Sequence, residues 1–136
     1  MKIKSKKIIY RTIVVVLLIG FICFGIYMKR VHDYQQTVKN MTFENIKLSD
    51  VKDGTYIGNC NVNLISAKVE VVVNSGKITN INILEHKNER GQKAEKVIDE
   101  VLNEQKIDVD AISGATNSSK VIKKAIEDAL KQGLIK

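Results

Sequence analysis

The chain of 136 residues contains no proline, no tryptophan and only two cysteines, Cys23 and Cys60. Cys23 lies in a long apolar run, so the part of the chain that follows this run cannot form an internal disulfide. The two cysteines also lack a spacing typical of a metal site. No Ser/His/Asp or Cys/His set typical of nucleophilic catalysis is identifiable. Whatever folds after the apolar run must therefore bury its core without covalent or metal cross-links.

Acidic residues are missing from the first 30 positions, which hold seven basic residues. The remaining 15 basic residues balance all 15 acidic ones, so the rest of the chain is formally neutral although the whole carries +7. A nucleic-acid-binding domain is expected to carry a basic face. The charge distribution therefore argues against a nucleic-acid partner.

An uncharged run, TIVVVLLIGFICFGIYM, occupies residues 12–28. As a helix it spans about 25 Å, close to the thickness of the hydrocarbon core of a membrane. Tyr10 and Tyr27 lie near its ends, where interfacial aromatic residues are favoured. The run therefore predicts a single membrane-spanning helix at the N-terminus.

Two alternatives to an uncleaved anchor are a cleaved signal peptide and a lipoprotein signal. No small-x-small cleavage pattern follows the run, and Lys29-Arg30 comes directly after it, which disfavours a cleaved signal. Bulky residues precede Cys23 where a lipoprotein signal needs small ones. Five basic residues before the run and two directly after it favour a cytoplasmic N-terminus at the cell membrane, with the rest outside the cytoplasm.

Three strands are predicted after a turn at Asp53-Gly54. Apolar and polar residues alternate from residue 56 to 64 and again from 68 to 73, and residues 78–85 continue as a strand. Asn74 to Lys77 has the composition of a hairpin turn, in which Gly76 is free to adopt a positive φ. Strands linked so closely predict an antiparallel meander.

Two amphipathic helices are predicted after the strands. Apolar residues have helical spacing from Ala94 to Leu102 and again from Val121 to Leu130, and the second helix is expected to end near Gly133. Asn117, Ser118 and Ser119 are candidates for its N-cap. The fold class is therefore α+β, a small antiparallel sheet packed by two helices after one transmembrane helix. We divide the chain into a basic tail and anchor (1–30), a juxtamembrane stalk (31–52) and a folded domain (53–136).

The segment DAISGATNSS, residues 110–119, runs as a loop of small residues into the second predicted helix. Small residues let another group approach the backbone, and a helix N-terminus suits an anion such as a phosphate. On these grounds alone, a tight turn before a helix cap is the simpler interpretation.

Asp110-x-x-Ser113-Gly114-Ala115-Thr116 resembles the flavinylation motif of the FMN-binding domain family. That family includes the FMN-carrying subunits of sodium-translocating NADH:quinone oxidoreductase and of the Rnf complex, and many short membrane-anchored bacterial proteins. The resemblance extends over about residues 53–132 and is carried also by Asp53-Gly54-Thr55-Tyr56-x-Gly58, by residues 75–79, by residues 85–88, and by Gly91, Lys93 and Ala94. The chain departs from the large subunits at residues 88–91, where only Gly91 matches their Glu-Thr-Pro-Gly loop.

The resemblance implies a covalent cofactor. A flavin transferase that uses FAD would attach FMN to Thr116 as a phosphoester, with Asp110, Ser113, Gly114 and Ala115 as recognition residues. Ser113, Gly114, Ala115, Asn117, His86 and Gly91 are then expected to lie near the FMN, although His86 is equally typical of the end of a strand.

These features together predict a membrane-anchored electron carrier outside the cytoplasm, between an electron donor and an acceptor at the membrane or cell surface. We expect a carrier rather than a complete enzyme, because the domain is small. A flavin-dependent reductase that acts directly on a small acceptor and a non-redox binding module are the alternatives.

Overall fold

The computed structural model describes residues 2–87 and 92–135, and these residues form two compact units. The first unit comprises residues 1–33 and the second residues 34–136. Helix α1, Lys2–Lys39, supplies the described residues of the first unit and the beginning of the second.

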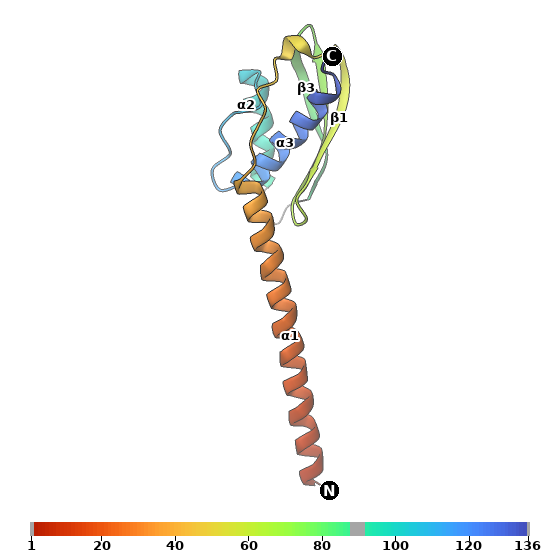
Figure 1. The fold of residues 1–136 in the computed structure, drawn as a ribbon, viewed down its shortest axis with the longest axis vertical. Coiled ribbons are helices and arrows are strands. Elements are labelled where there is room, and N and C mark those ends of the chain that lie inside the picture. Colours follow the sequence, from red (N-terminus) through yellow and green to blue (C-terminus); the bar gives the residue numbers. More distant parts are fainter. Residues whose placement is uncertain (1, 88–91, 136) are drawn as a thin grey trace. The chain divides into compact units, whose positions relative to one another are not determined.

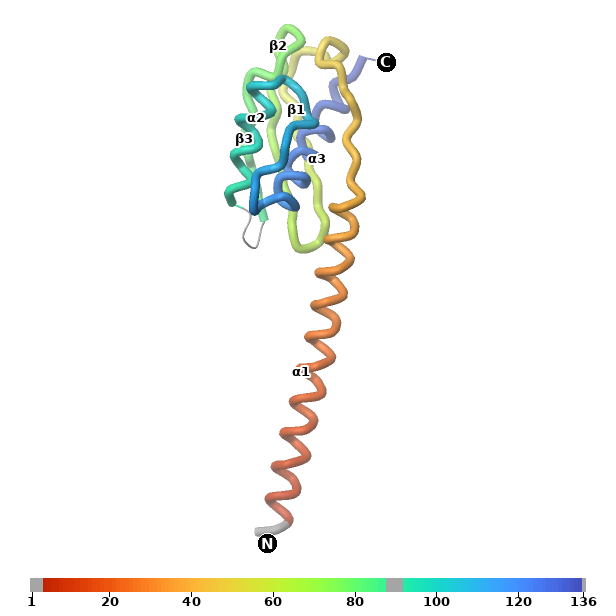
Figure 2. The backbone as a smooth tube through the Cα atoms, turned by 90° about the vertical axis from the view of Figure 1, so that its left-hand side faces the viewer, coloured from red at the N-terminus to blue at the C-terminus, as the bar shows by residue number. Residues whose placement is uncertain are grey.

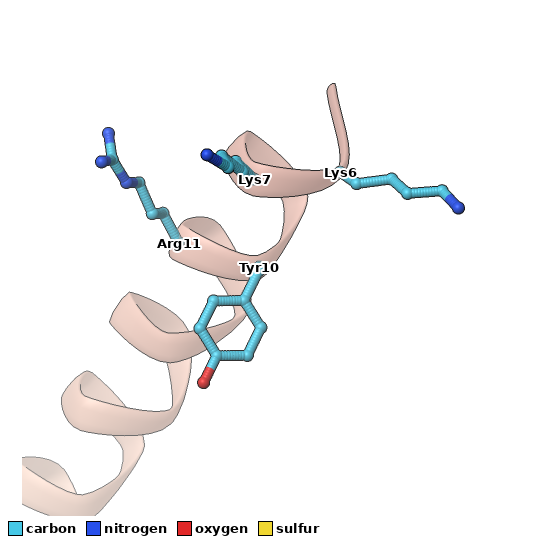
Figure 3. Close-up of a pocket in the computed structure, with 4 residues that line it drawn as sticks. All are labelled: Lys6, Lys7, Tyr10 and Arg11. Carbon is cyan, nitrogen blue, oxygen red and sulfur yellow. The ribbon is translucent and has the colours of Figure 1, made fainter. Parts of the chain in front are cut away.

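The first unit is a single helix whose apolar side chains are exposed. It is long and apolar enough to cross a membrane, and none of its most apolar stretch is buried within the protein. Figure 3 shows Lys6, Lys7, Tyr10 and Arg11 spreading outward from its first turns, so the shallow hollow among them has no opposing wall. Cations and a tyrosine beside an apolar run suit the headgroup region of a membrane.

The second unit is built on a three-stranded antiparallel sheet in the order β1-β2-β3. The strands are β1, Gly54–Asn61, β2, Ser66–Asn74, and β3, Lys77–Lys87. The β2–β3 hairpin turns through Ser75 and Gly76 at φ 53° and 71°, the two positive values of a type I′ turn. The predicted meander and its turn are therefore confirmed.

Helices cover one face of the sheet (Figure 1). α3, Thr116–Gln132, packs on β1 and β2, while α2, Val97–Glu104, follows the short 3-10 helix Gln92–Lys96 and packs beside β3. The core lies between these layers and includes Val69, Val71 and Ile126, all fully buried. On the opposite face of β1, Thr55, Ile57, Asn59 and Asn61 are exposed. The α+β fold class with a preceding apolar helix is confirmed.

Gly58 lets α3 touch the backbone of β1. A Cβ atom at this position would lie 2.0 Å from the Ala125 carbonyl oxygen and 2.4 Å from the Ala129 nitrogen. Two α3 side chains also form hydrogen bonds with backbone groups of β1. The Asn59 N–H donates to Asp128 Oδ2 (2.9 Å), and Gln132 Nε2 donates to the Ile57 carbonyl (2.6 Å). The position of α3 is therefore fixed by direct contact with this strand.

Residues 40–52 lie along α3 (Figure 2). The backbone of this segment is held at Thr42, whose carbonyl accepts from Lys124 Nζ (3.0 Å), and at Glu44, whose N–H donates to Glu127 Oε2 (3.2 Å). A 3-10 turn, Leu48–Asp50, follows, and Val51 forms a β-bridge with Leu134. The segment that the sequence suggested as a stalk thus packs against the domain.

Candidate functional site

The loop before α3 is a tight turn that presents Thr116. The Ala115 N–H donates to the Ile112 carbonyl (2.9 Å), and Gly114 has φ 78°. Positive φ at the third residue of a four-residue turn is the property of a type II turn, which selects glycine there. The space around the missing Cβ of Gly114 is open within 4 Å. The glycine is therefore required by backbone conformation, and the turn leaves room for another group.

Ser119 fastens this turn to the helix. Its side chain is buried, and its hydroxyl accepts from the Ile112 N–H (3.0 Å) and donates to the Ala115 carbonyl (2.9 Å). The prediction that Asn117, Ser118 or Ser119 forms the N-cap is wrong. The N-cap is Ala115, and within the described residues no side chain caps the helix. The hydroxyl that appeared available for capping is used instead to hold the preceding loop.

Thr116 is consequently the first residue of α3, and it is exposed. The N–H groups at positions 116–118 belong to the first helical turn, where the helix itself offers no carbonyl partner. The first turn also contains no acidic residue. A phosphoryl group on the Thr116 hydroxyl would thus lie at the positive end of the helix dipole, where an anion is stabilised.

The other residues of the motif differ in their exposure to solvent. Ser113 and Gly114 are exposed, Asn117 is half-buried and Ala115 is buried. Asp110 is exposed on the loop that leads into the turn. Thr116 and the two small residues Ser113 and Gly114 before it are therefore all exposed, which would leave room for a group attached at this position.

His86 lies near the end of β3 and has a buried side chain, which is 2% exposed. Its Nδ1 lies 3.0 Å from Glu95 Oε1. Since a carboxylate only accepts, His86 donates from Nδ1 in this pair. The contact joins the end of β3 to the 3-10 helix before α2, and whether the ring also contacts a flavin stays a prediction. Gly91, the remaining predicted cofactor residue, lies outside the described residues.

Three lysines on α3, namely Lys123, Lys124 and Lys131, form a cluster of polar contacts that the sequence analysis did not predict. Lys123 has a buried side chain, lies 4.4 Å from the centre of the Phe43 ring and donates to the Val109 carbonyl (2.5 Å). Burial lowers the pKa of Lys123, against the opposing effect of Asp108. The cluster holds residues 42–44 and the loop around Val109 against α3. The spacing of basic residues along the helix was visible in the sequence, but their partners were not.

Glu127 anchors the other end of this cluster. It is 1% exposed and lies 2.8 Å from Lys124 Nζ and 3.0 Å from Lys131 Nζ. Burial acts to raise its pKa, but the hydrogen bonds from Lys124 and Lys131 and from the Glu44 N–H outweigh burial, so the pKa is lowered from 4.5. Glu127 is therefore charged in the folded domain at neutral pH.

Comparison with known families identifies this domain. Residues 65–131 match the family model described as FMN-binding domain. No curated protein and no solved structure shows a significant match to the chain. The match covers β2, β3 and α2, and it reaches through the Thr116 turn almost to the end of α3. The chain therefore belongs, through residues 65–131, to the FMN-binding domain family.

Proposed function

We propose that this protein is a membrane-anchored electron carrier with FMN attached covalently to Thr116. The observation that carries the proposal is the exposed residue Thr116 at the start of α3, directly after a type II turn, within the family-matched segment. A bound flavin supplies the redox chemistry. The chain supplies the attachment point, an anion-stabilising helix end and a link to the apolar helix.

The attachment reaction follows from the chemistry of the hydroxyl. A bond forms between Thr116 Oγ1 and the phosphorus of the FMN moiety of FAD, the anhydride bond of FAD breaks, and AMP leaves. A threonine hydroxyl is a weak nucleophile without a base or metal, and within the described residues no group of three or more His, Cys, Asp or Glu side chains forms a metal site. We therefore assign activation of the hydroxyl and removal of its proton to a separate flavin transferase.

Intact mass of the full chain after co-expression with a flavin transferase tests the attachment. We expect a gain of one FMN less one water in the wild type, none in Thr116→Val, and a gain in the hydroxyl-bearing control Thr116→Ser. Because position 116 is exposed, both substitutions are expected to change stability by less than about 0.5 kcal/mol. An undiminished adduct in the valine variant would exclude Thr116 as the attachment residue.

We propose further that α1 remains as an uncleaved anchor, with its N-terminus in the cytoplasm and the domain outside. The five-to-two distribution of basic residues around positions 12–28 supports this orientation. Protease added to cells without an outer barrier should remove a C-terminal tag and spare an N-terminal one. The reverse pattern would show the opposite orientation.

The electron donor and acceptor are proposed as membrane or surface redox partners. The exposure of Thr116 supports exchange of electrons with a second protein, because a group tethered at this residue would start from the protein surface. Reduction of a small acceptor by the purified flavinylated protein alone, at a rate that does not depend on any added partner, would favour the direct reductase instead.

A further inference from the structure

The first half of α3 and the turn before it contain basic residues but no acidic ones. Between residues 111 and 126 there are three lysines, Lys120, Lys123 and Lys124, and no acidic residue. The N-terminal turn of a helix favours anions, and these lysines begin directly after that turn, where like charges repel one another. Lys120 is also close enough to Lys123 to contribute to the lowering of its pKa. The arrangement is unfavourable unless other groups compensate these charges.

Two of the three lysines have compensating carboxylates. Lys123 Nζ lies 3.6 Å from Asp108 Oδ1, and Lys124 Nζ lies 2.8 Å from Glu127 Oε1. Lys120 differs. Its Nζ lies 3.3 Å from the Val38 carbonyl and 3.5 Å from the Lys39 carbonyl, beyond the usual length of such bonds. Within residues 2–87 and 92–135, Lys120 forms no ion pair with a carboxylate.

Lys120 follows Thr116 by four residues on the same helix. Side chains at positions i and i+4 lie on one face, with their Cβ atoms about 5–6 Å apart. Thr116 is exposed and Lys120 is half-buried, so the flexible lysine side chain can reach a group attached to the threonine oxygen.

We propose that Lys120 is the cation that pairs with the flavin phosphate on Thr116, an assignment that rests on the proposed function. Its ammonium group also contacts the last carbonyls of α1, the negative end of that helix dipole. Lys120 is thus a positioning residue that holds the phosphate while joining the last turn of α1 to the first turn of α3.

The full chain in detergent micelles provides the test, with thermal unfolding of the domain measured before and after flavinylation. Intact mass first establishes the adduct in the wild type and in Lys120→Gln, Lys120→Arg and Lys106→Gln. Lys106 is a matched control, since it is exposed and pairs locally with Glu104 (2.6 Å). The readout is the rise in Tm that flavinylation produces in each protein.

We expect the rise in Tm to be smaller in Lys120→Gln by about 1–8 °C, the shift that an exposed ion pair gives in a domain of this size. Lys120→Arg and Lys106→Gln should retain the wild-type rise, and 1 M salt should reduce the difference. A second outcome also supports the assignment: Lys120→Gln is folded but takes no flavin, while Lys120→Arg is flavinylated. The positive charge at position 120 is then required for the flavin phosphate to be attached at Thr116.

An equal rise in Tm in Lys120→Gln and in the wild type would overturn the Lys120 assignment but not the proposed attachment. The flavin would be attached, but its stabilising effect would not depend on an ion pair between its phosphate and Lys120. Absence of an adduct in the wild type would overturn the proposed attachment, and the Lys120 assignment with it.

Discussion

Substitution of Gly58 by alanine should separate α3 from the sheet. The new Cβ would lie 2.0 Å from the Ala125 carbonyl oxygen and 2.8 Å from the Ala129 Cβ. Ordinary van der Waals contact begins at 3.4 Å, so the helix must move by about 1.4 Å, the difference between these distances. Both atoms belong to α3, and no side-chain rotation relieves the first contact.

The cost has two parts. Overpacking of this kind destabilises by about 1–3 kcal/mol. The movement also stretches the bonds from Asn59 to Asp128 and from Gln132 to Ile57, and each contributes about 1 kcal/mol. The sum, about 3–5 kcal/mol, is a large share of the stability of a small domain, about 5–15 kcal/mol.

Thermal unfolding of the full chain, followed by the near-ultraviolet signal of its tyrosines, measures the effect. We expect Gly58→Ala to lower the Tm by at least about 12 °C. Gly114→Ala is the matched control, because its Cβ has open space and only the positive φ is unfavourable, at about 1–2 kcal/mol. If the two variants had the same Tm, the close contact between α3 and β1 would not exist in the folded protein.

Further predictions concern the turn and the buried carboxylate. Gly114→Val should reduce flavin content in the folded fraction far more than it reduces the folded fraction itself, because its side chain occupies the open approach to Thr116. Flavin content per folded molecule, compared with Gly114→Ala, measures this, and parallel losses would show that the turn acts through stability alone. Glu127→Gln should lower the free energy of unfolding by about 1–3 kcal/mol at pH 7. Because folding lowers the pKa of Glu127 from 4.5, its stabilisation is present above that pH and is lost as pH falls through the lowered pKa. The difference between the wild type and Glu127→Gln should therefore shrink below about pH 4.5, and urea titrations at pH 7 and pH 3.5 would show whether it does.

Local patterns in the sequence determined the helices and strands of this protein and the faces that they bury. The apolar run predicted the long N-terminal helix, since 17 uncharged residues in a helix are nearly long enough to cross a membrane. Alternation with period two placed the three strands, and Ser75-Gly76 tolerates the two positive φ values of the hairpin turn. Apolar spacing identified the buried faces of α2 and α3, because each face follows from backbone geometry within one element.

Tertiary structure decided how these elements meet. Polar residues at 117–119 looked alike as capping residues in the sequence, but burial of Ser119 beneath the turn directs its hydroxyl to Ile112 and Ala115. The helix consequently begins at Thr116. Only the fold shows that residues 42–44 are clamped by the α3 lysines and that Lys120 reaches the end of α1. These contacts join residues about 80 positions apart in the sequence, and no periodicity within a single element specifies which distant backbone a long, flexible lysine will reach.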